Sequence, residues 1–125
     1  MDSKFYISYA AARLLKEKGY NEKCIFAYAD TSNGSDINGR IVFNSNDYPI
    51  GFYPCPTKSE AIDWLESKGV TISPHPVTIP CEESTTKTHW SCHIVHKDGT
   101  WYTTNDLPTR LEAEEAAIIK ALGLL

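Results

Sequence analysis

The sequence predicts an α+β domain in which one antiparallel sheet of about four to six strands carries three helices, mainly on one of its faces. Three segments carry signals for both the start and the end of a helix, and β-branched and aromatic runs fill the gaps between them. The order is helix, strands, helix, short strand, hairpin, helix, which is typical of helices gathered over an antiparallel sheet. We expect all 125 residues to form a single domain, since two halves of about 60 residues would each bury too little surface.

Each expected helix opens with a hydroxyl side chain that can act as N-cap and ends at a glycine. The second and third helices also carry glutamate three residues after the cap, the spacing of a capping box. The three expected segments run from Ser8 to Gly19, from Thr57 to Gly69 and from Thr109 to Gly123.

The strands are predicted between these helices, in runs rich in β-branched and aromatic residues. The clearest hairpin turns at Asp98-Gly99, a pair that suits a two-residue turn. Residues 31–39 and 73–87 are rich in turn formers or proline, so we expect loops there. The expected strands are 24–29, 40–44, 50–53, 70–72, 89–96 and 101–105.

Composition and charge exclude several classes of protein. The chain is 42% hydrophobic and 22% charged, which is close to a globular average and argues against disorder. No apolar run approaches the roughly 18 residues that cross a bilayer, and the start of the chain lacks the apolar stretch of a signal peptide. The formal net charge of −4 disfavours binding to duplex nucleic acid. We therefore expect a cytoplasmic protein that binds neither membranes nor duplexes.

The cysteines are widely spaced and form no CxxC pair, so we expect reduced thiols at small apolar positions. They are Cys24, Cys55, Cys81 and Cys92. Cys55 is the best candidate nucleophile because it precedes a helix start, and a helix N-terminus lowers the pKa of a thiol. Its base would have to be His75, His93 or His96, and nothing in the sequence places one beside it. We expect no catalytic residue and no cofactor.

Four potential metal ligands lie within eight residues: His89, Cys92, His93 and His96. On a helix their spacing would place them on one side and suit zinc. The segment is typical of a strand, however, where His89 and His93 face one way and Cys92 and His96 the other. We therefore expect no metal site.

One face of the predicted hairpin is the candidate ligand-binding surface. Pairing about Asp98-Gly99 places Ile94 opposite Thr103 and directs the more apolar side chains to the core. The opposite face then carries aromatic and hydrogen-bonding side chains, which could hold a planar or polar ligand or simply face water. Its members are His89, Ser91, His93, Tyr102 and Thr104.

Several runs of the chain resemble a group of small uncharacterised proteins encoded by Bacteroidetes genomes, prophages and phages. The resemblance covers Tyr6-Ile7-Ser8-Tyr9, residues 14–24, Pro56-Thr57 with residues 60–65, and residues 121–125. It implies a short cytosolic accessory product of a phage or its host, and it assigns no residue a role. The strand followed by a Thr-x-x-Glu-Ala helix also resembles HicB-type antitoxins at the level of the fold.

From these observations we expect a non-enzymatic accessory protein of phage or prophage type that acts by binding, above all to a protein of the phage or the host. One alternative is a sponge-like protein for a small nucleotide or polar signal, with Tyr102 stacking on a base and His89 and His93 contacting anionic groups. Another is a small Cys/His hydrolase or metal-binding protein. A homodimer through an uncovered sheet edge or face is a further expected state.

Overall fold

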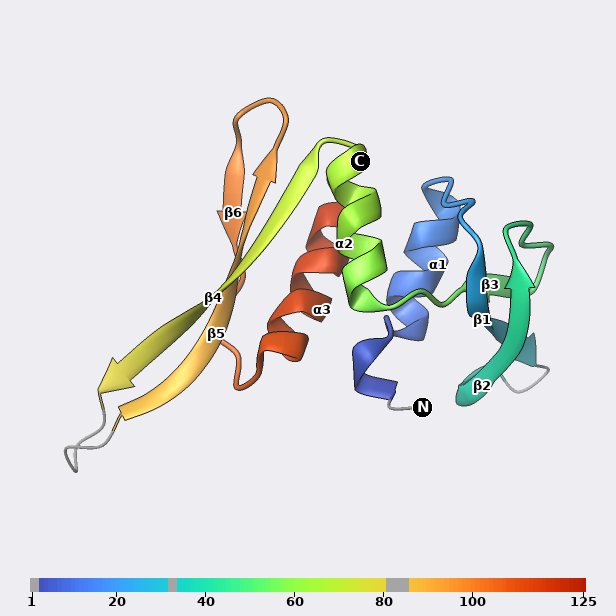
Figure 1. Ribbon diagram of the computed structural model, residues 1–125, viewed down its shortest axis with the longest axis horizontal. Helices are drawn as coiled ribbons and strands as arrows, with labels where there is room; N and C mark the ends of the chain where they lie inside the picture. Colours follow the sequence, from blue (N-terminus) through green and yellow to red (C-terminus); the bar gives the residue numbers. More distant parts are fainter. Residues whose placement is uncertain (1–2, 32–33, 81–85) are drawn as a thin grey trace.

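The computed structural model describes residues 3–31, 34–80 and 86–125 (Figure 1). The α+β class is confirmed, with three α-helices and antiparallel strands. The helical elements are the 3-10 helix η1 (Ser3–Phe5), α1 (Tyr9–Glu17), α2 (Lys58–Ser67) and α3 (Arg110–Leu122). The strands are β1 (Cys24–Thr31), β2 (Gly34–Ser45), β3 (Phe52–Pro54), β4 (Val70–Pro80), β5 (Thr86–His96) and β6 (Trp101–Thr103).

The strands form two separate sheets, so the prediction of one sheet with four to six strands is wrong. The orders are β2-β1-β3 and β4-β5-β6, and each sheet holds three strands. The helices lie between the two sheets (Figure 1), with α2 and α3 against β4 and β5, and α1 against β3. Helix α3 also contacts α1 and α2, because its buried residues form a stripe broad enough to face a sheet and two helices.

The predicted helix starts are confirmed. Ser8 accepts a hydrogen bond from the backbone N–H of Ala11 (3.2 Å), and Thr109 accepts one from Glu112 (3.2 Å). Thr57 and Glu60 form a complete capping box, which satisfies two otherwise unpaired N–H groups. These bonds fix where each helix begins, because each joins residues only three positions apart.

Strand β4 is longer than predicted. Only 70–72 were expected as strand, but β4 pairs with β5 in one continuous register from Val70 opposite His96 to Pro80 opposite Thr86. The prolines at 74, 76 and 80 share one parity, and β4 is an edge strand. Along an edge strand every second N–H points away from the sheet and makes no hydrogen bond to the neighbouring strand. Proline, which has no N–H, therefore removes no interstrand hydrogen bond at those positions. Residues from Gly34 likewise belong to β2 and not to the expected loop.

The buried side chains form one cluster that includes residues of all three helices and of both sheets. Its largest fully buried aliphatic members are Ile7, Leu15, Leu65, Val70, Ile94, Ile118 and Leu122. Each such side chain contributes about 1.5–3 kcal/mol relative to an exposed one. Within residues 3–31, 34–80 and 86–125, no helix is both long enough and apolar enough to span a bilayer.

Three of the four cysteines lie in the described part of the chain. Cys24, Cys55 and Cys92 are buried, as expected for small apolar positions, and no disulfide joins these three to one another. Cys81 lies outside the described residues.

Candidate functional site

One face of the sheet β4-β5-β6 points away from the helices, and we call it the outer face. Ile72, Cys92 and Ile94 are buried on the opposite face, against the helices. Successive side chains of a strand alternate between faces, so the register assigns the intervening residues to the outer face. The described outer-face residues are Thr71, Ser73, His75 and Val77 on β4, His89, Ser91, His93 and Val95 on β5, and Trp101 and Thr103 on β6.

Three aromatic rings lie in a row across this face, one from each strand. The rings of His75 and His93 have centroids 4.4 Å apart and are tilted by 54°. His93 in turn lies 6.2 Å from Trp101, in an edge-to-face arrangement. Trp101 is 66% exposed, and Val95, directly opposite it on β5, is 43% exposed. The outer face therefore offers a partly apolar surface on the side of the sheet that points away from the described helices (Figure 1).

Over residues 71–77, 89–95 and 101–103 the outer face carries no formal charge, whereas the same parity continues along the β4-β5 hairpin to Ile79 and Lys87. The outer-face members in those ranges are hydroxyl residues, histidines, valines and one tryptophan, whereas 22% of the whole chain is charged. Depletion of charge combined with an exposed aromatic residue distinguishes the centre of a protein interface from ordinary surface. An antiparallel sheet that merely faced water would carry polar residues on that side, as most of this face does, so Trp101 and Val95 are the residues that depart from that pattern.

Tyr102 is not on the outer face, so the predicted pairing that placed it there with His89 and His93 is wrong. The hairpin pairs Ile94 with Tyr102, one residue away from the predicted pairing of Ile94 with Thr103. The loop holds three residues between His96 and Thr100, whose backbones are bonded at 2.8 Å, and its last residue, Gly99, has a φ of 92°. A three-residue loop of this kind shifts the register by one, which moves every β6 side chain to the other face.

Trp101 takes the place predicted for Tyr102. The Tyr102 ring instead packs against the core, and the ammonium of Lys120 on α3 lies 4.9 Å from its centroid. The register also explains why Trp101, an aromatic residue that the predicted pairing directed to the core, is exposed.

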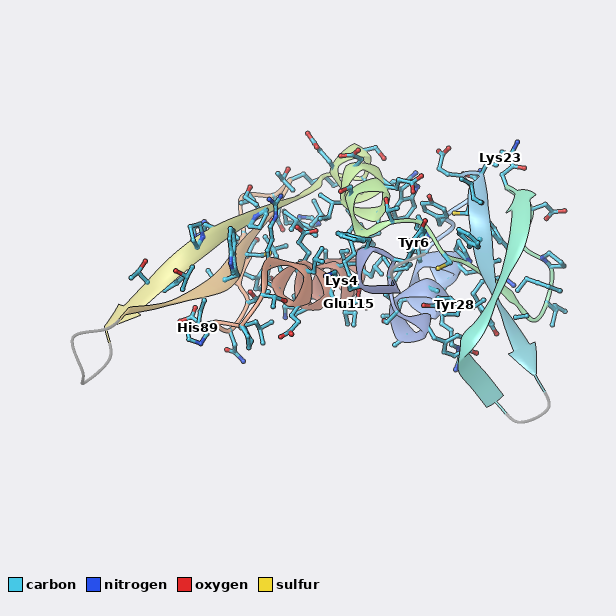
Figure 2. All side chains as sticks on the ribbon, turned by 60° about the horizontal axis from the view of Figure 1, so that its bottom comes forward. Lys4, Tyr6, Lys23, Tyr28, His89 and Glu115 are labelled. Carbon is cyan, nitrogen blue, oxygen red and sulfur yellow. The ribbon has the colours of Figure 1, made fainter. Side chains whose placement is uncertain are left out.

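Two further predicted residues have their polar groups engaged inside the protein. The Thr104 hydroxyl accepts a hydrogen bond from the Cys92 N–H (2.9 Å), and the Thr104 carbonyl accepts one from the Ser91 hydroxyl (2.9 Å). Ser91 has outer-face parity but is only 4% exposed. The hairpin does place His89 and His93 on the outer face, as predicted. Figure 2 shows His89 on the β4-β5 hairpin, far from Tyr28 at the other sheet.

His75 belongs to the outer face but was missed, because residues 73–87 were interpreted as a loop. One signal in the sequence could have found it. The prolines at 74, 76 and 80 occupy only even positions, and an edge strand tolerates proline at alternate positions. Such a strand directs the odd residues, His75 among them, to the same face as His89 and His93.

The structure does not assemble the potential metal ligands. In the described part of the chain no group of three or more His, Cys, Asp or Glu side chains could hold a metal ion. The Nδ1 atoms of His75 and His89 are buried without a hydrogen-bond partner, whereas a metal-ligating histidine usually donates its second N–H. Cys92 lies on the opposite face, where desolvation by burial, with a contribution from Glu114, raises the pKa of its thiol to about 11.

The structure also separates Cys55 from its predicted bases. Cys55 is 1% exposed and lies between β3 and α2, where its N–H bonds to Phe26 of β1. His75, His93 and His96 belong to the other sheet, beyond α2 and α3 (Figure 1). Comparison of the chain with protein-family models, with curated proteins and with solved structures finds no match.

Proposed function

We propose that this protein is a non-enzymatic binding protein whose outer face contacts a protein partner. The observation that carries the proposal is the exposure of Trp101 and Val95 on the part of the sheet face, residues 71–77, 89–95 and 101–103, whose assigned side chains carry no charge. Tryptophan is enriched among the few residues that dominate binding energy in protein interfaces. Desolvating a neutral face costs less than desolvating a charged one, so contact with a partner is favoured there.

The partner contacts side chains and not the edge of the sheet. The sheet has two edge strands: the prolines of β4 interrupt the row of N–H groups that an added strand would need, and β6, Trp101–Thr103, is only three residues long. The outer face, in contrast, presents Trp101 beside His93 and His75 as a continuous set of rings. Burying the exposed part of Trp101 would contribute about 2 kcal/mol or more to binding, as interface tryptophans do.

The biological setting is proposed on the sequence resemblance alone: an accessory product of phage or prophage genes, acting on a phage or host protein. The absence of catalysis is proposed because Cys55 lies between β3 and α2, whereas the histidines that could have cooperated with it belong to the sheet β4-β5-β6.

The proposal is tested by affinity capture with matched variants. The whole protein, its Trp101→Ser variant and its Ile50→Ser variant are each used to capture proteins from a lysate of the organism that encodes the chain. Ile50 is 98% exposed and lies outside the outer face, so it controls for loss of any exposed apolar side chain. We expect a partner that binds the whole protein and Ile50→Ser but not Trp101→Ser. Equal capture by Trp101→Ser, or recovery of this chain itself as the only partner, would contradict the proposal.

A second candidate function is the binding of a small molecule with a planar ring, and the row of three rings is the observation that favours it. Base–aromatic stacking contributes about 1–3 kcal/mol per base. Adenosine monophosphate is the probe. Its binding is measured by NMR, as changes in the ring resonances of His75 and His93. Binding that is lost in Trp101→Ala and kept in Ile50→Ala supports this function, and unchanged resonances at millimolar nucleotide exclude it for this probe.

A further inference from the structure

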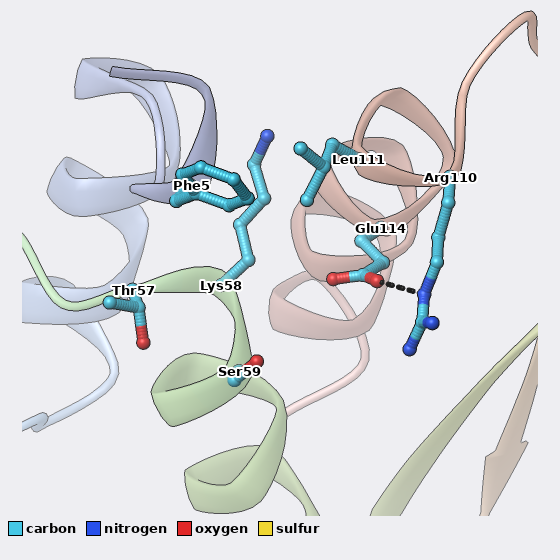
Figure 3. A pocket seen from close by; sticks show the side chains of 7 residues that line it. All are labelled: Phe5, Thr57, Lys58, Ser59, Arg110, Leu111 and Glu114. Atoms are coloured by element: carbon cyan, nitrogen blue, oxygen red, sulfur yellow. Dashed lines mark hydrogen bonds and ion pairs between the residues drawn. The ribbon is translucent and has the colours of Figure 1, made fainter. Parts of the chain in front are cut away.

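A cavity of about 500 Å³ lies where the N-termini of α2 and α3 meet η1 (Figure 3). Lys58 and Ser59 line it from α2, Arg110, Leu111 and Glu114 from α3, and Phe5 from η1. It is far from the outer face, which lies on the other side of α3 and its sheet (Figure 1). A cavity of this size accommodates a small organic ligand.

Lys58 is the unusual residue of the cavity. It is only 7% exposed, and its ammonium donates a hydrogen bond to the Lys4 carbonyl (2.7 Å). Among the described residues it has no ion pair, so one carbonyl is its only partner there. An ammonium has three donors and is costly to bury without a negative partner. The described residues therefore give the Lys58 ammonium no negatively charged partner.

Glu114 does not fill that role, although its side chain lines the same cavity. Its carboxylate accepts a hydrogen bond from Arg110 Nε at 2.8 Å, one turn away on α3. In Figure 3 the Lys58 side chain points towards η1 and away from this carboxylate. Arg110 is 60% exposed at its side chain, and its terminal nitrogens lie beyond the Nε that Glu114 engages. Both cations thus retain donors that an incoming anion could use.

The backbone adds to this preference for an anion. Helices α2 and α3 both begin at the cavity, and the positive end of each helix dipole is at its N-terminus. The caps Thr57 and Thr109 occupy the N–H groups of Glu60 and Glu112, the third residue of each helix. The antiparallel bridge between Tyr6 and Thr57 engages the backbone at the start of α2, so the helix dipoles and the two cationic side chains, and not the Lys58 N–H, are what favour an anion there.

We infer that this cavity binds a singly charged carboxylate that carries an apolar group, with Lys58 as the principal anion ligand. The charged lining residues are Lys58, Arg110 and Glu114, which together carry one positive charge. That charge balances a monoanion, whereas a phosphate dianion would also meet the Glu114 carboxylate without compensation. Phe5, which is 50% exposed, and Leu111 provide apolar contacts for the rest of the ligand.

Hexanoate is the probe, because it joins one carboxylate to a short apolar chain, and hexanamide and inorganic phosphate are the controls. Amide resonances of residues 58–60 and 110–112 are followed by NMR in the whole protein. We expect hexanoate to shift them and the two controls to leave them unchanged. Lys58→Met removes the charge at similar length and should weaken hexanoate binding about tenfold or more, as loss of a hydrogen bond to a charged group does.

Lys68→Met is the matched control, because Lys68 follows the end of the same helix and is exposed. Hexanoate should bind this variant as it binds the whole protein. Should Lys58→Met fail to fold, Arg110→Gln changes a well-exposed side chain and is expected to weaken hexanoate as well. Equal binding of hexanamide, tighter binding of phosphate, no shift with hexanoate, or unchanged affinity in the variant tested would each overturn the inference.

Discussion

Glu115 of α3 accepts a hydrogen bond at 3.0 Å from the backbone N–H of Ser8, although the two residues lie 107 positions apart in the chain. Ser8 is the N-cap of α1, so a carboxylate from another helix stabilises the positive end of α1. The second carboxylate oxygen of Glu115 is buried and has no hydrogen-bond partner among the described residues. Through this contact α1, which packs on β3, is joined to α3, which packs on β4 and β5.

Replacing Glu115 should therefore destabilise the whole fold. We expect Glu115→Ala to lower the free energy of unfolding by about 1–3 kcal/mol, because the Ser8 N–H loses its acceptor. Glu115→Gln keeps an acceptor at that position and should lose less. Urea unfolding measures the free energy of unfolding of both variants. The control is Glu66→Ala, at an exposed position of α2, whose free energy of unfolding should lie within about 0.5 kcal/mol of that of the unchanged protein. Similar losses for Glu115→Ala and Glu66→Ala would show that the contact contributes nothing.

The assignment of faces in the β5-β6 hairpin predicts opposite effects for two neighbouring aromatic residues. Tyr102 packs against the core and Trp101 is 66% exposed, so Tyr102→Ala should cost about 2 kcal/mol or more and Trp101→Ala less than about 1 kcal/mol. Urea unfolding of the two variants gives the order directly. A larger loss of stability for Trp101→Ala than for Tyr102→Ala would contradict this assignment. It would support the predicted two-residue turn at Asp98-Gly99, which places Tyr102 on the outer face.

Local signals in the sequence were sufficient for the helix starts and for part of the outer face. The caps at Ser8, Thr57 and Thr109 act over three residues, so spacing alone reveals them. The common face of His89 and His93 follows from the period of two along a strand. Both properties belong to a single element and need no knowledge of its neighbours.

Properties that depend on two elements could not be predicted in the same way. The position of Tyr102 depends on whether the turn contains two or three residues, and both choices fit the sequence around Asp98-Gly99. The division into two sheets depends on pairings such as Ala27 with Pro54, which join strands separated by all of β2. Prolines concealed the length of β4, since their tolerance depends on the strand being at an edge.

The turn between β5 and β6 predicts that the stability of the protein depends on pH. The hydroxyl and the N–H of Thr100, the latter at 2.8 Å, donate to the Asp98 carboxylate and lower its pKa. Because the folded pKa lies below the unfolded one, the stabilisation is present above the unfolded pKa and is lost as the pH falls through the folded pKa. An NMR titration of the Asp98 carboxyl should show the lowered pKa. It should return towards its ordinary value in Thr100→Ala, and an unchanged value there would assign the effect to another group.

Burial predicts that the described cysteines react slowly. Desolvation raises the pKa of the Cys24 thiol, and it raises that of Cys92 to about 11. The thiolate is the reactive form, so iodoacetamide at pH 8 should modify these two thiols and the buried Cys55 at least about tenfold more slowly in the folded protein than in urea. The experiment uses the Cys81→Ser variant, which leaves only these three thiols. Mass spectrometry of the peptides assigns a modification rate to each cysteine. Fast modification of Cys55 in the folded protein would contradict the inference from its burial and would support Cys55 as a nucleophile.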